Sequence, residues 1–218
     1  MAAADLSRRA VAEGIGTALL LATVVGSGIM GDRLSGGNVA IALLANTLAT
    51  GAGLVALILT FGPISGAHFN PVVTLMAAVK GDAPPREVLP YVLAQVLGAF
   101  AGVALAHVMF GEPVFSVSTH VRSGLGQGVA ETTATFGLLA VIQSVGKSRP
   151  TAGPFAVGAY ITAAYWFTAS TSFANPAVTL ARAATRTFAG IRPADVPLFV
   201  GAALSIVVFG WLLRREEA

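Results

Sequence analysis

The sequence predicts an all-α membrane protein with six transmembrane helices, two re-entrant half-helices and an inverted internal repeat. Three observations support this fold class. Hydrophobic residues make up 55% of the 218 positions and charged residues only 11%, whereas soluble domains carry roughly 25% charged residues. Two Asn-Pro pairs, Asn70-Pro71 and Asn175-Pro176, each open an apolar run too short to cross a bilayer. A Val-Ala-Glu motif also precedes two corresponding apolar stretches.

Six apolar stretches are long enough, or nearly so, to be transmembrane helices. A hydrocarbon core of about 30 Å requires roughly 20 helical residues. The stretches cover approximately 10–30, 38–61, 88–110, 127–146, 153–171 and 195–213. The first is rich in glycine and is followed by five others, so we expect it to remain as a membrane helix and not to be removed as a signal peptide.

Two further apolar segments, 69–79 and 175–184, are predicted to be half-helices. At 1.5 Å per residue each covers about half of the hydrocarbon core. In both, Asn is expected at the N-cap and Pro at the first helical position. Two such helices that enter from opposite faces and meet at their N-termini complete one span. The irregular backbone before them, at 62–68 and 170–174, is tolerated at membrane depth only where protein covers it or where it lines a water-filled path.

The two halves of the chain correspond in outline. Glu13 and Glu131 each end a Val-Ala-Glu motif at the start of a span. The first repeat covers about 8–110 and the second about 126–215, and each reads as helix, helix, half-helix, helix. Because each repeat contains an odd number of spans, the second copy must be inverted relative to the first. We therefore expect a single transmembrane domain over residues 1–218.

The charged residues indicate a topology. The Lys and Arg residues occur singly or in pairs, which does not favour nucleic acid as a partner. If both termini are cytoplasmic, eight basic residues lie inside and five outside, in agreement with the positive-inside rule. The inner set is Arg8, Arg9, Lys80, Arg86, Lys147, Arg149, Arg214 and Arg215, and the outer set is Arg33, Arg122, Arg182, Arg186 and Arg192. The chain has no cysteine and three scattered histidines, so we expect no disulfide, metal site or cofactor.

The motifs resemble those of the aquaporin and aquaglyceroporin family, also called major intrinsic proteins. The segment Ser65-Gly66-Ala67-His68-Phe69-Asn70-Pro71 is similar to the family's first pore loop almost letter for letter, and Asn175-Pro176-Ala177 matches its second triplet. The first triplet, Asn70-Pro71-Val72, departs from the family by Val in place of Ala. The resemblance covers nearly the whole chain. It implies a channel without enzymatic activity, a homotetramer and, for a bacterial member, location in the inner membrane.

The resemblance also implies roles for the polar residues of both loops. Asn70 and Asn175 are expected to face each other at the pore centre and to donate hydrogen bonds to a passing oxygen. The two helix N-termini beside them, each equivalent to about half a positive charge, would oppose cations and protons. A charge inside a membrane is expensive, and the resemblance implies that Glu13 and Glu131 accept hydrogen bonds from the loop backbone. His68 either hydrogen-bonds the permeant molecules or braces its loop.

The predicted selectivity filter is unusual. Counting from the motifs without gaps, the filter positions of the family correspond to Thr50, Ala163, Ser172 and Val178. Val178 stands where the family usually has an arginine, so we expect a filter that is wider and less polar than that of a water-selective pore. Arg182 lies one helical turn further out. It either reaches into the vestibule and partly replaces the missing charge or lies at the membrane interface.

The predicted function is passive permeation of small uncharged solutes: water, glycerol, urea and neutral arsenite or related metalloid acids. An ion-coupled secondary transporter of a small solute is the first alternative, since such proteins also have inverted repeats and broken helices. Within the channel class, a water-selective pore is the second. An intramembrane hydrolase is disfavoured, because no Gly-x-Ser-x-Gly motif or intramembrane Asp pair occurs.

Overall fold

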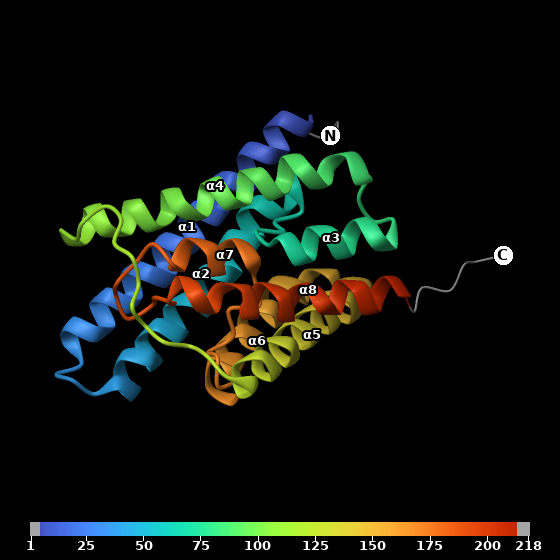
Figure 1. The fold of residues 1–218 in the computed structure, drawn as a ribbon. Helices are drawn as coiled ribbons and strands as arrows, with labels where there is room; N and C mark the ends of the chain where they lie inside the picture. The colour runs from blue at the N-terminus through green and yellow to red at the C-terminus, as the bar shows by residue number, and fades with distance from the viewer. Residues whose placement is uncertain (1–4, 213–218) are drawn as a thin grey trace.

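The computed structural model describes the backbone of residues 5–212 and the side chains up to residue 208. This part of the chain is helical and contains no strand (Figure 1). The α-helices are α1 (Leu6–Leu34), α2 (Val39–Ser65), α3 (Pro71–Lys80), α4 (Pro85–Phe110), α5 (Leu125–Ser148), α6 (Gly153–Phe167), α7 (Pro176–Arg182) and α8 (Val196–Leu212). Two single 3₁₀ turns, Pro150–Ala152 and Pro193–Asp195, precede α6 and α8.

Four of these helices, α1, α2, α4 and α5, are long and apolar enough to cross a membrane, while α6 and α8 have 15 and 17 described residues. The predicted fifth span, 153–171, is too long at its end. Helix α6 stops at Phe167 because Thr168 adopts an extended backbone, with φ −110° and ψ 135°. Residue 213 of the sixth predicted span, the predicted end of the second repeat at 215, Arg214 and Arg215 lie outside the described residues.

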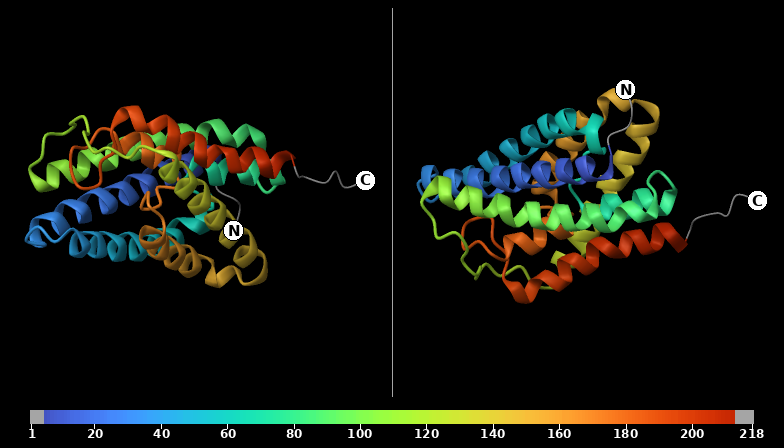
Figure 2. Two further views of the ribbon diagram at one scale, coloured as in Figure 1. Left: turned by 60° about the horizontal axis from the view of Figure 1, so that its bottom comes forward. Right: turned by 90° about the horizontal axis from the view of Figure 1, so that it is seen from above.

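The two half-helices are present, and both predicted N-caps are confirmed. Helix α3 has 10 residues and begins two residues after the start of the predicted segment. Helix α7 has 7 residues and begins one residue after the start of its predicted segment. The Asn70 side chain accepts a hydrogen bond from the backbone N–H of Val72. The Asn175 side chain accepts from the N–H groups of Ala177 and Val178. The two helices contact each other and lie nearly end to end in the middle of the molecule (Figures 1 and 2).

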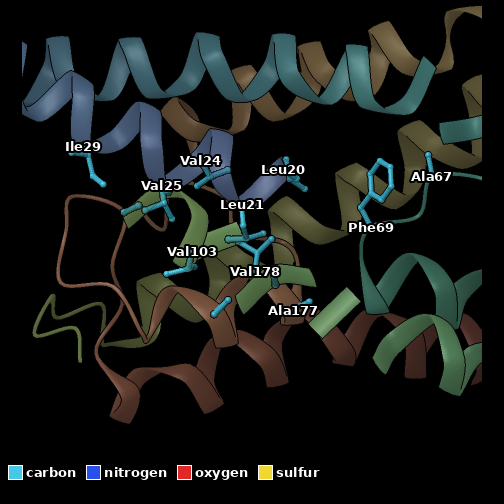
Figure 3. Close-up of a cluster of buried hydrophobic side chains, with 14 residues drawn as sticks. Leu20, Leu21, Val24, Val25, Ile29, Ala67, Phe69, Val103, Ala177 and Val178 are labelled. Atoms are coloured by element: carbon cyan, nitrogen blue, oxygen red, sulfur yellow. The ribbon is translucent and has the colours of Figure 1, made fainter. Parts of the chain in front are cut away.

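Helix packing surrounds this central pair. Helix α1 packs along α2 and α4 in the first half, while α5 packs on α6 and α8 in the second, and α2 contacts α6 across the two halves. One buried apolar cluster joins α1, α4, α7 and the loop before α3. Figure 3 shows Leu21 of α1, Val103 of α4 and Val178 of α7 converging within it. The half-helices are therefore held by the same core that joins the long helices.

The helix ends define two sides of the bundle. Helix α1 begins, and the described part of α8 ends, on the same side as the turn between α3 and α4 (Figures 1 and 2). The long connection between α4 and α5 crosses the opposite side. There the backbone N–H groups of Ser116 and Ser118 donate to the carbonyls of Ala184 and Ala183, just after α7. These bonds attach the connection to the residues that follow the C-terminal end of α7.

Small residues allow α1 and α4 to approach closely. A Cβ atom added at Gly98 of α4 would overlap the backbone carbonyl of Gly14 in α1. We expect Gly98→Val to force the two helices apart and to lower the midpoint of thermal unfolding in detergent by at least about 5 °C, since overpacking a well-packed contact costs roughly 1–3 kcal/mol. Gly201→Ala in α8, where an added Cβ meets open space, is the control and should leave the midpoint within about 2 °C. A Gly98→Val midpoint equal to that of the control would contradict this packing.

Candidate functional site

A cavity of about 620 Å³ follows both half-helices. Its lining includes Asn70 and Asn175 at the facing N-termini of α3 and α7. It also includes Lys80 and Arg182, the last residues of the same two helices. The cavity therefore contacts both ends of both half-helices. Because these helices lie nearly end to end, it extends along the bundle from one side towards the other.

The two asparagines tie the half-helices together. The Nδ2 atom of Asn70 donates to the carbonyl of Ala174 at 2.7 Å, and Nδ2 of Asn175 donates to the carbonyl of Phe69 at 2.8 Å. Each side chain thus caps its own helix with its oxygen and bonds the opposite loop with its nitrogen. An amide nitrogen carries two hydrogens. One of them remains for a molecule in the cavity, which both asparagines line.

Glu13 supports the first loop through four hydrogen bonds. Its Oε1 accepts from the Ser65 hydroxyl at 2.6 Å and from the His68 backbone N–H at 2.9 Å. Its Oε2 accepts from the Phe69 backbone N–H at 2.7 Å and from the Gln95 side-chain amide at 2.8 Å. The carboxylate is fully buried. Its interactions are those that the resemblance implied, and they account for a charge at a buried position in a membrane helix.

Glu131 supports the second loop in the same way. It is fully buried, and its two oxygens accept from the backbone N–H groups of Phe173 and Ala174 at 2.9 and 2.8 Å. In a trans peptide the N–H and the preceding C=O point in opposite directions. Because the glutamates hold the N–H groups, the carbonyls of Ala67, His68, Ser172 and Phe173 point away from them, and these four residues line the cavity. The cavity therefore has backbone acceptors on both sides of the asparagine donors.

Both loops adopt a backbone that non-glycine residues rarely take. The residues one and three positions before each capping asparagine have positive φ: Ala67, Phe69, Ser172 and Ala174. Each such residue costs roughly 1–3 kcal/mol unless its surroundings impose it. In both loops the residues with positive φ lie at the same distances before the capping asparagine, and in both a glutamate accepts hydrogen bonds from the loop backbone. The two loops therefore share one strained backbone conformation.

The structure brings three of the four predicted filter residues to the cavity. Thr50, Ser172 and Val178 are all buried and line it. Among the described residues, no hydrogen-bond partner reaches the buried Ser172 Oγ atom. Val178 presents an apolar side chain to the same cavity.

The prediction that Ala163 is the fourth filter residue is wrong. It is exposed on the surface of α6 and does not line the cavity. The cavity face of α6 consists instead of Val157, Ile161 and Tyr165, and a residue two positions from Ile161 and Tyr165 lies on the opposite face of a helix. The Tyr165 hydroxyl donates to Thr50 Oγ1 at 3.3 Å, so Tyr165, and not Ala163, is the α6 residue that lies beside Thr50 at the cavity.

His68 lies on the cavity wall and braces its loop as well. Its Nδ1 is 3.1 Å from the Thr74 hydroxyl of α3, and its ring packs edge-on against Tyr91, with centroids 5.5 Å apart. The Thr74 hydroxyl in turn accepts from the Gln95 amide that also reaches Glu13. The two alternatives considered for His68 are therefore compatible, since the residue contacts both the loop scaffold and the cavity.

Two arginines converge on one aromatic ring near the C-terminal end of α7. The guanidinium carbon of Arg182 lies 3.4 Å from the centroid of the Phe173 ring, and that of Arg122 lies 5.0 Å from it. Arg182 lines the cavity and donates from Nε to the Ala189 carbonyl. Arg122 comes from the long connection, and no sequence pattern linked it to the site. Of the two alternatives for Arg182, the buried position beside the cavity is the one observed.

Comparison with known proteins agrees with this architecture. A family model described as major intrinsic protein matches residues 1–170. The aquaglyceroporin AqpS of Rhizobium meliloti (strain 1021) is 55% identical over 215 residues, which cover 96% of this chain and 92% of that protein. An aquaporin Z of Bradyrhizobium diazoefficiens is 30% identical over 227 residues, which cover 94% and 93%.

A solved structure shares the fold. The X-ray structure of the aquaglyceroporin from Plasmodium falciparum superposes with a TM-score of 0.74 and covers 95% of this chain and 93% of its own, at 22% identity. The paired capping asparagines, the glutamate-held loops, the matching family model and the full-length relatives lead to the same conclusion. The chain belongs to the major intrinsic protein family.

Proposed function

We propose that this protein is a passive membrane channel for small uncharged solutes. The observation that carries the proposal is the single cavity lined by both capping asparagines and extending along both half-helices. Amide donors at its centre and backbone carbonyls on either side can replace hydrogen bonds that a neutral solute makes with water. The names of the two similar proteins, an aquaglyceroporin and an aquaporin, support the same class of activity.

We further propose that the pore admits solutes larger than water, such as glycerol, urea and neutral arsenous acid. The outer lining combines hydroxyl groups from Thr50, Ser172 and Tyr165 with the apolar side chain of Val178. Such a surface offers hydrogen bonds along one side and apolar contact along another, which suits the polar and carbon-bearing faces of a polyol. An arginine at position 178 would occupy part of this space.

Ion-coupled transport is disfavoured by the state of the carboxylates on which it would depend. Glu13 and Glu131 are each occupied by backbone amides of the pore loops, so neither is free to bind and release a coupling ion. The test is stopped-flow flux of water, glycerol, urea and arsenous acid in proteoliposomes. A channel equilibrates each permeant solute without a proton or sodium gradient, and accumulation above equilibrium would reject this proposal.

Val178→Arg should separate large solutes from water. The new side chain would enter the outer part of the cavity, so we expect glycerol and urea flux to fall at least about tenfold, with water flux reduced about threefold or less. Val178→Leu, which adds volume without charge or donors, is the matched control and should give a smaller and less selective loss. If Val178→Arg reduced the fluxes of water and glycerol equally, Val178 would not be a filter residue.

We also propose the assembly and orientation that the family resemblance implies. The chain would form a homotetramer in a bacterial inner membrane, with both termini in the cytoplasm. Large apolar side chains on the outward faces of the long helices, such as Val11, Leu97 and Val129, suit contact with lipid or with neighbouring subunits. Measuring the mass of the protein in detergent tests the tetramer. The orientation is tested with a cysteine introduced at position 86 in place of Arg86, which a membrane-impermeant reagent should label from the cytoplasmic side and not from the other side.

A further inference from the structure

Two buried arginines at the outer end of the cavity have no acidic partner. Arg122 is 9% exposed and Arg182 only 2%. Within the described part of the chain the salt bridges join Arg9 to Glu87, Arg33 to Glu112, and Arg192 to Asp195. Buried charges are normally paired, because burial without a partner is costly. Two unpaired positive charges beside one cavity therefore require an explanation.

Arg182 is held in place by groups that leave its charge intact. Its guanidinium stacks on the Phe173 ring, and its Nε bonds the Ala189 carbonyl. Neither group is anionic. The buried Glu131 carboxylate attracts the charge without forming an ion pair with it, so it offsets the positive charge only in part. An arginine side chain has five N–H donors, and the hydrogen bonds of the described residues account for one of them. The side chain lines the cavity, so the remaining donors are available to molecules inside it.

Arg122 holds the same region from the other side of the fold. Its Nε donates to the Gly190 carbonyl at 3.0 Å, and its Nη1 donates to the Ser170 carbonyl at 3.2 Å. It also contacts the Phe173 ring but does not line the cavity. Arg122 therefore fixes the position of the loop and ring on which Arg182 rests, and it adds positive potential behind them.

We propose that Arg182 is the cation-excluding residue of this pore, with Arg122 as a positioning residue. The inference rests on the proposed channel function and adds which residue sets charge selectivity. A fixed positive charge in a narrow, poorly screened cavity repels cations strongly, because the local dielectric is far below that of water. Val178, one helical turn nearer the capping asparagines, cannot supply such a charge. Arg182 lines the same cavity and supplies it.

Urea and the guanidinium cation are suitable probes, because they are planar and nearly equal in size but differ by one charge. Guanidinium stays charged at neutral pH, as the arginine side chain does. Uptake of each is measured in proteoliposomes, with internal potassium and valinomycin compensating the charge that guanidinium carries. For Arg182→Gln we expect the guanidinium-to-urea flux ratio to rise at least about tenfold, with urea flux changed less than threefold.

Arg186→Gln is the matched control, since Arg186 lies four residues further on and is exposed. It removes the same charge from the same side of the protein, and the flux ratio should stay at the wild-type value. Arg182→Met keeps a long side chain against Phe173 and repeats the comparison if the Gln variant does not fold. The double variant Val178→Arg with Arg182→Gln should return the ratio towards wild type.

The outcomes separate this inference from the proposed function. A wild-type protein that conducts neither urea nor glycerol would reject the channel proposal itself. A wild-type protein that conducts urea but also conducts guanidinium equally well would overturn only the role of Arg182. An unchanged ratio in both Arg182 variants, or an equal rise in Arg186→Gln, would overturn it as well.

Discussion

Asn175→Leu is expected to abolish permeation of water, glycerol and urea together. The substitution removes the acceptor for the N–H groups of Ala177 and Val178 and the donor to the Phe69 carbonyl. It also places a branched apolar side chain where the cavity has an amide donor. Flux should fall at least about 30-fold for every solute, measured by stopped-flow light scattering and normalised to the amount of folded protein.

Asn38→Leu separates capping from the role in the pore. Asn38 caps α2 in the same manner, accepting from the N–H groups of Ala40 and Ile41, but it is exposed and does not line the cavity. Losing a helix cap costs roughly 1 kcal/mol. The Asn38 variant should therefore lose a little stability and keep its flux. If both variants lost flux equally, or if Asn175→Leu conducted glycerol normally, a central role for Asn175 would be wrong.

The features that could be predicted from sequence were those that local chemistry determines. An Asn followed by Pro fixes a helix start within a few residues, since the side chain caps the helix and the ring suits the first turn. The start of each half-helix was therefore predictable. The pairing of Glu13 and Glu131 with the loops followed from the family resemblance. Their repeated motif supported it, and the hydrogen bonds observed agree with it.

The residues that line the cavity beside α6 and α7 were less predictable, because they depend on helix register and on contacts between distant segments. The count from the motifs that indicated Ala163 allowed no gaps. The face of α6 that meets the cavity depends instead on where the helix ends and on the positive-φ turns that follow. Tyr165 is identified only once that face is known. Arg122 lies in an irregular connection, and its approach to Phe173 follows from backbone pairing with the segment after α7.

Gln95 illustrates a second limit of the sequence. It stands in the middle of an apolar helix, where a lone amide is a sign of function or of a buried polar network. Its partners, Glu13 and Thr74, lie on two other helices. No spacing rule connects these three positions. Only the packing of α4 against α1 and α3 brings them together.

Glu13→Ala should lower the thermal stability more than Gly98→Val or Asn38→Leu does. It would leave the Ser65 hydroxyl, the N–H groups of His68 and Phe69, and the Gln95 amide without their acceptor. Hydrogen bonds to a charged group contribute about 1.5–3 kcal/mol each, and buried donors left unpaired add to the cost. We expect the midpoint of thermal unfolding in detergent to fall by at least about 10 °C, with loss of flux, since the backbone of the first loop is strained and is held mainly by this carboxylate.

Two comparisons show whether the cause is the hydrogen-bonding role of Glu13 or the removal of a carboxylate in general. Glu112→Ala removes a partly exposed partner of Arg33, and surface ion pairs contribute about 0–1 kcal/mol, so the midpoint should hardly move. Glu13→Gln keeps the size of the side chain but turns one acceptor oxygen into a donor that faces other donors. It should therefore be closer to Glu13→Ala than to wild type. A Gln variant as stable as wild type would mean that side-chain volume, and not the acceptance of loop N–H groups, is what position 13 provides.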